Sequence, residues 1–262
     1  MRYPKFLQEK GAIGFVAPSF GCNIEPYKTA FNHALEKWHA MGHQTDLGPN
    51  CYEGSGIGIS NTPEACGKEL TAYYCSSNNN VLISCGGGEL MCETMSCVDF
   101  EAIKAAEPKW YMGYSDNTNM TFLLTTLCDT AAIYGPCAAA FGMEPWHPSI
   151  QDAYDVLRGE KKCVSGYELW EKESLKDKEH PLLPYNVTEE RNIRMFLPIT
   201  REAEAQGECE PESFWGKESP EAQVQMEGRL VGGCMDCLVN LLGTKFDDVK
   251  GFDIPEGITY IG

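Results

Sequence analysis

Residues 110–127 read WYMGYSDNTNMTFLLTTL, and the architecture of the chain can be worked out from this stretch. Trp110–Met112 is a short apolar run that predicts a strand, and Asn119–Leu127 is predicted to be the helix that follows it. The turn between them holds the hexapeptide Gly113–Thr118. A serine on a tight strand-to-helix turn has its hydroxyl pushed out of the backbone, where a substrate can reach it. Ser115 is therefore a candidate nucleophile.

The residues around Ser115 fit such a turn. Gly113, two positions before the serine, is small enough for a tight bend, and Asn117, two positions after it, tolerates strained backbone angles better than most residues. The following helix directs its free N–H groups and the positive end of its dipole at the serine, which would help to hold an oxyanion. Viewed alone, the hexapeptide fits a helix-capping serine slightly better than a catalytic one.

On both sides of this stretch, apolar runs alternate with amphipathic ones. The expected strands are Ala12–Pro18, Val81–Cys85, Trp110–Met112 and Ala131–Tyr134. The expected helices are Glu25–Met41, Thr62–Tyr74, Phe100–Ala106, Asn119–Leu127 and Ile150–Arg158. Strands that alternate with helices predict an α/β fold, with a parallel sheet covered on both faces. Ligands bind outside the carboxyl ends of such strands, where the turns at Gly86, Ser115 and Gly135 should meet.

Two domains are expected. Residues 1–158 form a Rossmann-like N-terminal domain that carries the serine turn, and the charged, proline-containing residues 159–190 read as a linker. Residues 191–262 are predicted to form a smaller second α/β domain. At its centre, Gly228–Thr244 reads as a strand, a glycine turn and an apolar helix, a pattern that packing in a core also explains. The chain stops on the strand-like run Gly257–Gly262, so we expect this domain to be incomplete.

Composition and charge exclude several classes of partner. The 262 residues are 43% hydrophobic, which is typical of a globular protein, and carry a formal net charge of -17. Such a surface repels nucleic-acid phosphates and anionic lipid, so we expect neither as a partner. No run approaches the ~20 apolar residues of a membrane helix, and the N-terminus has no secretory pattern. A soluble, cytoplasmic protein is expected.

The sequence contains 13 cysteines. Without an export signal, buried reduced thiols are expected rather than a disulfide framework. Cys234 and Cys237 have the spacing of half a zinc site, but no second CxxC and no Cys/His pair at ligand spacing accompany them. We therefore expect neither a metal nor another cofactor.

A loop of three glycines, Gly86–Gly88, closes the apolar run Val81–Cys85. Its main-chain N–H groups can approach a ligand closely and could supply an oxyanion donor beside the serine turn. The loop could equally cradle a phosphate, although GxGxxG and a P-loop lysine are absent from the sequence. A plain tight turn explains the loop about as well when it is viewed alone.

A serine nucleophile needs a base, usually histidine, and an orienting carboxylate. No histidine stands at the carboxyl end of an expected strand, and each is predicted to be solvated rather than catalytic. The five histidines are His33, His39, His43, His147 and His180.

Taken together, these motifs resemble the LD-carboxypeptidases, a family that includes the microcin C immunity peptidases. The order and spacing of five segments carry the resemblance, which runs from Gly11 to Gly262. These segments are Ala17-Pro18-Ser19, Gly86–Gly88, Gly113–Thr118, Tyr134-Gly135-Pro136 and Gly228–Thr244. The chain departs from the family in two places, with Cys85 where the family often has arginine and Cys234 where it often has asparagine.

The resemblance implies a Ser-Glu-His triad at the join of two domains. Ser115 matches the nucleophile, and the main-chain N–H groups of Gly87 and Asp116 match the oxyanion donors. The triad glutamate would fall at Gly262 or just beyond it, and the histidine later still, so neither is assigned to a residue. Four further residues are candidates for the substrate loops by their place in the motifs: Gly86, Gly88, Gly113 and Asn117.

The activity implied by the resemblance is hydrolysis of an L,D-peptide bond at the C-terminus of a cell-wall muropeptide, in cell-wall recycling. One alternative is cleavage of a microcin C-like peptide–nucleotide, for which Phe214-Trp215 could stack a nucleobase. Another is an inactive homologue that only binds. The 262 residues by themselves are predicted to lack peptidase activity, and the family implies a homodimer.

Overall fold

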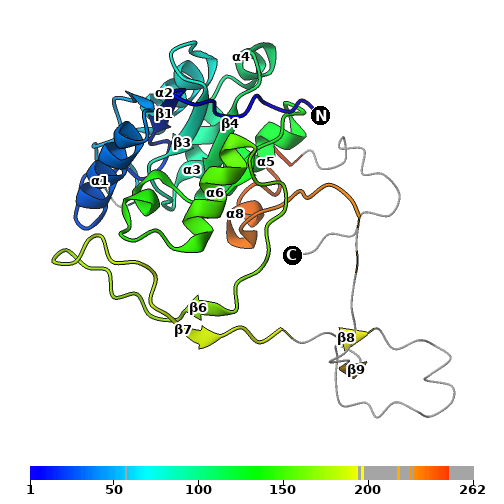
Figure 1. Ribbon diagram of the computed structural model, residues 1–262. Helices are drawn as coiled ribbons and strands as arrows, with labels where there is room; N and C mark the ends of the chain where they lie inside the picture. The colour runs from blue at the N-terminus through cyan, green and yellow to red at the C-terminus, as the bar shows by residue number, and fades with distance from the viewer. Residues whose placement is uncertain (57, 194–195, 198–216, 219–224, 226, 248–262) are drawn as a thin grey trace, which may run out of the picture. The chain divides into compact units, whose positions relative to one another are not determined.

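The computed structural model describes residues 1–56, 58–193, 196–197, 217–218, 225 and 227–247. The chain divides into two compact units (Figure 1). The first comprises residues 1–165, 174–185 and 230–262, and the second comprises residues 166–173 and 186–229. The expected division into 1–158, 159–190 and 191–262 stays a prediction, because much of 191–262 lies outside the described residues.

The first unit is built on a five-stranded parallel sheet with the order β2-β1-β3-β4-β5. Its strands are β1 Ala12–Val16, β2 Gln44–Leu47, β3 Val81–Ser84, β4 Trp110–Gly113 and β5 Ile133–Tyr134. The predicted α/β fold and its four predicted strands are confirmed. The edge strand β2 was not predicted, because its sequence QTDL is polar and half exposed and lacks an apolar run.

Helices connect these strands, as the crossovers of a parallel sheet require. The connecting helices are α1 Tyr27–Ala40, α2 Pro63–Cys75, α3 Met91–Thr94, α4 Phe100–Ala105 and α5 Thr118–Thr126, and a further helix, α6 Pro148–Arg158, follows β5. Short 3₁₀ turns are η1 Met95–Cys97, η2 Ser115–Asn117 and η3 Ala138–Gly142. Five helices were predicted and lie within about two residues of the expected bounds. The Thr62 hydroxyl caps α2 by accepting a hydrogen bond from Ala65 N–H, at 3.3 Å.

Each face of the sheet is covered by its own hydrophobic cluster (Figure 1). Alternate strand residues enter opposite clusters, as the twofold repeat of a strand dictates. Phe15, for example, packs with Phe31 and Trp38 of α1, whereas Val16 belongs to the cluster on the other face. Burying one such large side chain contributes about 1.5–3 kcal/mol, so both helical layers are held firmly on the sheet.

Residues 230–247 belong to the first unit. They include the short helix α8 Met235–Val239, and Leu241 and Phe246 are buried in the same cluster as α5. The main-chain N–H of Cys234 donates to the Thr118 hydroxyl at 2.9 Å. Residues 230–244 of the Gly228–Thr244 block therefore belong to the unit that bears Ser115, although we expected this block at the centre of a separate domain.

The second unit contains two antiparallel strand pairs. β6 Leu169–Glu171 pairs with β7 Val187–Glu190, and β8 Phe196–Leu197 pairs with β9 Lys217–Glu218. Both β6 and β7 fall within residues 159–190, which were expected to be a linker. These short strands were not predicted, because charged residues and prolines hide the alternation of apolar and polar residues that indicates a strand.

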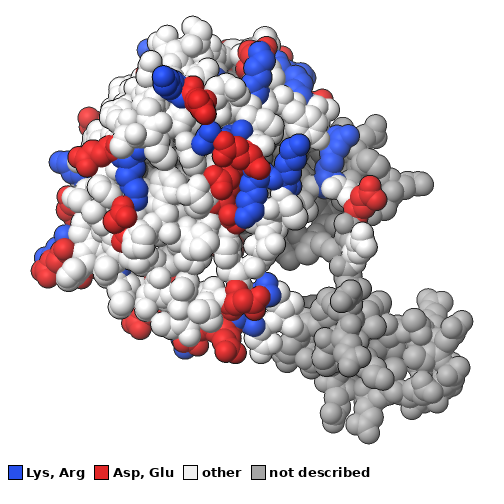
Figure 2. Space-filling model, in the orientation of Figure 1, with Lys and Arg blue, Asp and Glu red and all other residues white. Residues whose placement is uncertain are grey.

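The described surface and thiols bear on the expected partners. On the face drawn in Figure 2, Lys and Arg side chains are interspersed with Asp and Glu, without the continuous basic area that binds a phosphate backbone. Within the described ranges, no helix has both the length and the apolar character to cross a membrane. The cysteines at described positions are free thiols, and His, Cys, Asp and Glu side chains there form no metal-binding group.

Candidate functional site

Ser115 sits on a strained turn between β4 and α5. Its φ is +62°, in the left-handed region that residues other than glycine rarely adopt. Such a conformation costs about 1–3 kcal/mol and persists where the surrounding structure enforces it, often at functional sites. Among the described residues, the Ser115 hydroxyl has no hydrogen-bond partner. The N-cap position of α5 is occupied by Asn117. Ser115 is therefore not a capping residue, which removes the main alternative to a nucleophile.

Asn117 was expected to adopt a strained backbone conformation, but its role is a different one. Its φ is −60°, ordinary helical backbone, so the strain of the turn lies at Ser115 and not at Asn117. The Asn117 side chain instead donates to the carbonyls of Tyr114, at 3.0 Å, and Gly86, at 3.1 Å. A Cβ on Gly113 would lie 2.7 Å from Asn117 Cγ, so glycine is needed there for this side chain to fold back. Asn117 thus ties the serine turn to the glycine loop.

The glycine loop lies directly against Ser115. A Cβ built on Gly87 would lie 2.7 Å from Ser115 Cβ, so only glycine allows this approach. The N–H of Gly88 already donates to the Asp116 carboxylate at 2.9 Å. Within the described chain, the N–H groups of Gly87 and Asp116 make no hydrogen bond and remain available as donors. This arrangement favours Gly87 over Gly88 as the oxyanion donor of the loop.

The Asp116 carboxylate joins three loops that follow different strands. It accepts hydrogen bonds from the Ser19 hydroxyl, from Gly88 N–H and, at 3.4 Å, from Met91 N–H. Burial raises the pKa of this carboxyl, and the hydrogen bonds from Ser19 and Gly88 act in the opposite direction. The sequence singled out Asp116 only for its main-chain N–H. The role of its side chain was missed, because its partners are 97, 28 and 25 residues away.

Tyr134, at the end of β5, completes the turn. Its hydroxyl accepts a hydrogen bond from Ser115 N–H at 3.1 Å. The neighbouring Gly135 is part of the turn expected beside Ser115, and its N–H donates to the carbonyl of Gly113 at 3.4 Å. The expected meeting of the turns after β3, β4 and β5 at one edge of the sheet is therefore confirmed.

Next to Ser115 the surface is hollowed into a pocket of about 160 Å³. Nine described residues line it: Phe20, Tyr27, Cys85, Gly86, Gly87, Tyr114, Ser115, Cys137 and Ala139. The residues come from the ends of β1, β3 and β4, from the start of α1 and from the segment around η3. A substrate group bound there would lie beside the serine hydroxyl.

The histidines are engaged away from this pocket. The imidazole of His33 contacts Gly142 O at 2.8 Å, His39 contacts the Thr45 hydroxyl at 2.9 Å, and His180 contacts Asp177 at 3.2 Å. His147 caps α6 through Ser149 N–H, at 3.2 Å. Within the described residues, none of these side chains makes a hydrogen bond to Ser115.

The prediction that every histidine is solvated is wrong for His43. Only 4% of His43 is exposed, and its ring contacts Gly11 O at 3.0 Å and the Tyr154 hydroxyl at 2.7 Å. Burial lowers the pKa of this imidazole. His43 follows the end of α1, and the long-range contact with α6 that covers it has no signal in the local sequence.

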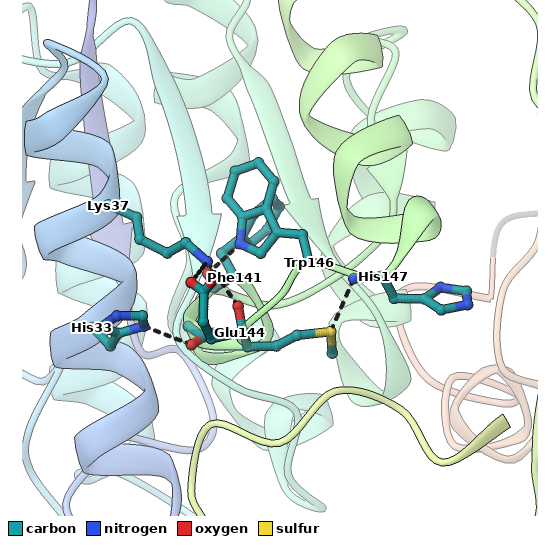
Figure 3. Close-up of polar contacts among 8 residues, drawn as sticks. His33, Lys37, Phe141, Glu144, Trp146 and His147 are labelled. Atoms are coloured by element: carbon teal, nitrogen blue, oxygen red, sulfur yellow. Dashed lines mark hydrogen bonds and ion pairs between the residues drawn. The ribbon is translucent and has the colours of Figure 1, made fainter.

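A second polar cluster, shown in Figure 3, has a structural task. The Lys37 ammonium donates hydrogen bonds to the Glu144 carboxylate at 2.6 Å and to Met143 O at 2.8 Å. It also lies 5.1 Å from the centre of the Trp146 ring. Trp146 in turn donates to Phe141 O at 2.6 Å. These contacts fasten the segment after η3 to α1 and thereby hold one wall of the pocket in place.

The comparisons with known proteins agree with this geometry. Residues 13–135 match the model of the LD-carboxypeptidase N-terminal domain. Among curated proteins, none shows significant sequence similarity to the chain.

Solved structures share the fold. The microcin C7 self-immunity protein MccF in complex with aspartyl sulfamoyl adenosine is 20% identical, with a TM-score of 0.72 over 94% of this chain and 67% of that one. MccF in complex with glutamyl sulfamoyl guanosine is 20% identical, with a TM-score of 0.71 over 93% and 66%. An MccF-like protein from Bacillus anthracis is 19% identical, with a TM-score of 0.54 over 60% and 47%.

The chain thus spans about two thirds of the length of the MccF structures. At these identities the likeness to solved structures shows the fold, and the family model adds the sequence pattern that contains the Gly86–Gly88 loop and the Ser115 turn. Residues 13–135 of this chain thus match the N-terminal domain of the LD-carboxypeptidase family of peptidases.

Proposed function

We propose that this protein is a serine peptidase that hydrolyses an L,D-peptide bond at the C-terminus of cell-wall muropeptides, with Ser115 as the nucleophile. The observation that carries the proposal is the strained Ser115, which holds a free hydroxyl against Gly87 at the mouth of a pocket. The triad glutamate and histidine implied by the family have no counterpart among the described residues.

The reaction follows from the arrangement of donors around Ser115. The Ser115 oxygen attacks the substrate carbonyl while its proton passes to the histidine base, and the carbonyl oxygen becomes an oxyanion. The N–H groups of Gly87 and Asp116 stabilise that oxyanion. The base then protonates the leaving amine, the C–N bond breaks, and water releases the acyl group from Ser115 as an acid.

The test is release of D-alanine from a muramoyl tetrapeptide by the protein, measured by mass spectrometry. Activity that is lost by at least about a thousandfold in Ser115→Ala supports the proposal, because nucleophile and base act as a unit. Ser77→Ala, at an exposed serine that does not line the pocket, is the matched control and should keep full activity. Equal turnover by Ser115→Ala and the unchanged protein would refute Ser115 as the nucleophile.

A second candidate is cleavage of a peptide–nucleotide such as microcin C, which would confer immunity. The fold shared with MccF, whose complex holds aspartyl sulfamoyl adenosine, favours it. The expected nucleobase-stacking pair Phe214-Trp215 lies outside the described residues. Incubation with an aspartyl sulfamoyl adenosine distinguishes the candidates, since only the second predicts release of aspartate from this compound and none of D-alanine from the tetrapeptide.

A third possibility, an inactive homologue that only binds, predicts tight binding of the tetrapeptide without turnover. A homodimer in the cytoplasm, with a small peptide as ligand, remains part of the proposal. Light scattering of the purified protein tests the dimer.

A further inference from the structure

The motif Cys234-Met235-Asp236-Cys237 has no part in the proposed reaction, yet its backbone is arranged for a covalent change. Cys234 occupies the N-cap position of α8, and Cys237 lies in the first turn of this helix. The N–H of Cys237 donates to Cys234 O at 3.1 Å, which closes the turn. A helical turn holds the Cα atoms of residues three apart at about 5 Å, and a disulfide needs a separation of about 4.4–6.8 Å. The backbone therefore has the spacing of a disulfide.

The two thiols are in contact. Burial raises the pKa of the Cys237 thiol to about 12, and the hydrogen bond with the Cys234 thiol contributes to this rise. A hydrogen bond raises the pKa of a thiol when it favours the protonated form, so Cys237 is the donor and the sulfur of Cys234 is the acceptor. Cys234 is consequently the sulfur that attacks an oxidant, and Cys237 is the one that reacts second.

Both thiols of this pair are partly exposed, so a small oxidant has access to them. Thiol contacts also join Cys85 to Cys22 and Cys51, but these three residues are fully buried. Exposed disulfides are more easily reduced than buried structural ones, and they are the labile or regulatory kind. Access and contact together distinguish the pair in α8 from the buried thiols of the core.

A metal ion is the other occupant that this spacing suggests. A zinc site takes four protein ligands, or three and a water molecule. Among the residues that the structure describes, no group of three or more His, Cys, Asp or Glu side chains is placed to hold a metal ion. The pair is therefore a dithiol with no further ligand from the described chain.

The dithiol lies against the helix that follows Ser115, and Figure 1 shows α8 beside α5. The N–H of Cys234 donates to the hydroxyl of Thr118, the first residue of α5, at 2.9 Å. The negative charge of Asp116 also contributes to the raised pKa of Cys237. A change in the covalent state of the pair therefore takes place within electrostatic reach of the residue next to Ser115.

We propose that Cys234 and Cys237 are a site of reversible oxidation, at which a low-molecular-weight disulfide such as oxidised glutathione converts the two thiols into an intramolecular disulfide. The thiolate of Cys234 attacks one sulfur of the oxidant, breaks its S–S bond and releases one small thiolate. Cys237 then gives up its proton, attacks the Cys234 sulfur of the mixed disulfide and releases the second small thiolate. Two electrons and two protons leave the protein on two molecules of the small thiol. The inference does not depend on Ser115 being a nucleophile.

Peptide mapping of the full chain tests the proposal. The protein is incubated with oxidised glutathione, its remaining thiols are blocked with N-ethylmaleimide, and its peptides are weighed by mass spectrometry. The peptide with Cys234 and Cys237 should lose two hydrogen atoms and take up no maleimide, and dithiothreitol should restore both thiols. Cys163, an exposed cysteine, reports that the oxidant has acted by taking up glutathione. If Cys163 carries glutathione while both cysteines of the pair stay reduced, the proposal is wrong.

Serine variants test the order of attack. In Cys237→Ser no second thiol resolves the mixed disulfide, so glutathione should remain on Cys234. In Cys234→Ser the remaining Cys237 keeps its proton, and it should take up glutathione at least about tenfold more slowly, because the thiolate is the attacking species. Equal or faster uptake by Cys237 would overturn the assignment of Cys234 as the attacking sulfur.

Cys163→Ser is the matched control, because it removes an exposed thiol outside the motif. This variant should form the disulfide between Cys234 and Cys237 as fast as the unchanged protein does. Loss of the disulfide in Cys163→Ser would mean that oxidation reaches the pair by exchange with Cys163, and it would overturn direct attack by Cys234. A disulfide that links either cysteine of the pair to a different cysteine would overturn the proposal as well.

Discussion

At the scale of single residues, Ser115 and Asp116 have different roles in the turn between β4 and α5. Ser115 holds a free hydroxyl in the left-handed region of the backbone, at φ +62°. Asp116 stabilises that conformation, because its carboxylate accepts hydrogen bonds from the Ser19 hydroxyl and the Gly88 N–H. A strained residue persists only where such neighbours compensate its cost. The same carboxylate keeps Gly87 beside the serine by holding the next residue of the loop.

The raised pKa of Asp116 predicts a pH dependence. Since the folded-state pKa is raised above the ordinary value of 3.8, the stability contributed by this group is present below that value and is lost as pH rises through the folded pKa. Asp116→Asn removes the titration and can keep one acceptor for Gly88. The stability of the unchanged protein relative to Asp116→Asn should therefore be greater at about pH 5 than at about pH 8.

Urea unfolding of both proteins at the two pH values measures this difference. The unchanged protein could instead gain stability relative to Asp116→Asn as the pH rises. That result would mean that the hydrogen bonds lower the pKa of Asp116 by more than burial raises it.

At the scale of elements, the site is formed where the ends of parallel strands meet. β3 leads into the Gly86–Gly88 loop, β4 into Ser115, and β5 into Tyr134. The loops approach so closely that their side chains must be small or absent. The glycine loop is therefore sensitive to an added methyl group.

Gly87→Ala should separate the loop from the serine turn. The new Cβ would lie 2.7 Å from Ser115 Cβ, an atom fixed to the backbone. Relief requires one loop to move, so we expect a loss of about 1–3 kcal/mol in the free energy of unfolding and the loss of Ser115-dependent hydrolysis. Chemical denaturation and the D-alanine assay measure the two effects.

Gly86→Ala is the control from the same loop. Its Cβ would meet Phe20 Cδ1 at 2.8 Å, and this ring can turn away. It should cost less stability than Gly87→Ala. If the two variants are equally stable, the close approach of Gly87 to Ser115 is not the feature that demands glycine.

The contact between α5 and residues 230–247 supports another prediction. Thr118→Ala removes the hydroxyl that accepts from Cys234 N–H, at a cost of about 0.5–1.5 kcal/mol. Amide hydrogen exchange in residues 234–247 should accelerate, because this segment is held on α5 in part by that bond. Thr118→Ser keeps the hydroxyl and should keep the protection. Unchanged exchange in Thr118→Ala would show that Leu241 and Phe246 hold the segment without the hydrogen bond.

At the scale of the whole molecule, charge governs stability more than any single ion pair. A formal net charge of -17 makes the folded chain repel itself, and salt screens this repulsion over a Debye length of about 10 Å at 0.1 M. Raising KCl from about 0.02 M to about 0.2 M at neutral pH should therefore raise the melting temperature by a few degrees. Differential scanning calorimetry measures the change.

The control for this effect is the same titration at about pH 5, close to the sequence pI of 4.7. Near the pI the net charge is small, and salt should have little effect on the melting temperature. A similar rise at both pH values would indicate that salt acts through apolar burial rather than through charge.

The sequence alone determined the layers of the fold and the position of the candidate nucleophile. Apolar runs such as Val81–Cys85 and amphipathic ones such as Thr62–Tyr74 predicted the strands and helices, because hydrophobic periodicity is a local property. The serine turn was visible for the same reason: glycine, serine and the following helix lie within a few residues. The polar edge strand β2 was missed because its pairing with β1, not its composition, makes it a strand.

Tertiary structure alone decided what surrounds Ser115. The Asp116 carboxylate meets Ser19 and Gly88 from different loops, His43 is buried beneath α6, and Cys137 reaches the wall of the pocket. These partners are separated by tens of residues, and no local pattern encodes which distant groups share one space. Periodicity specifies which way a residue faces, whereas packing specifies which other residues it meets there.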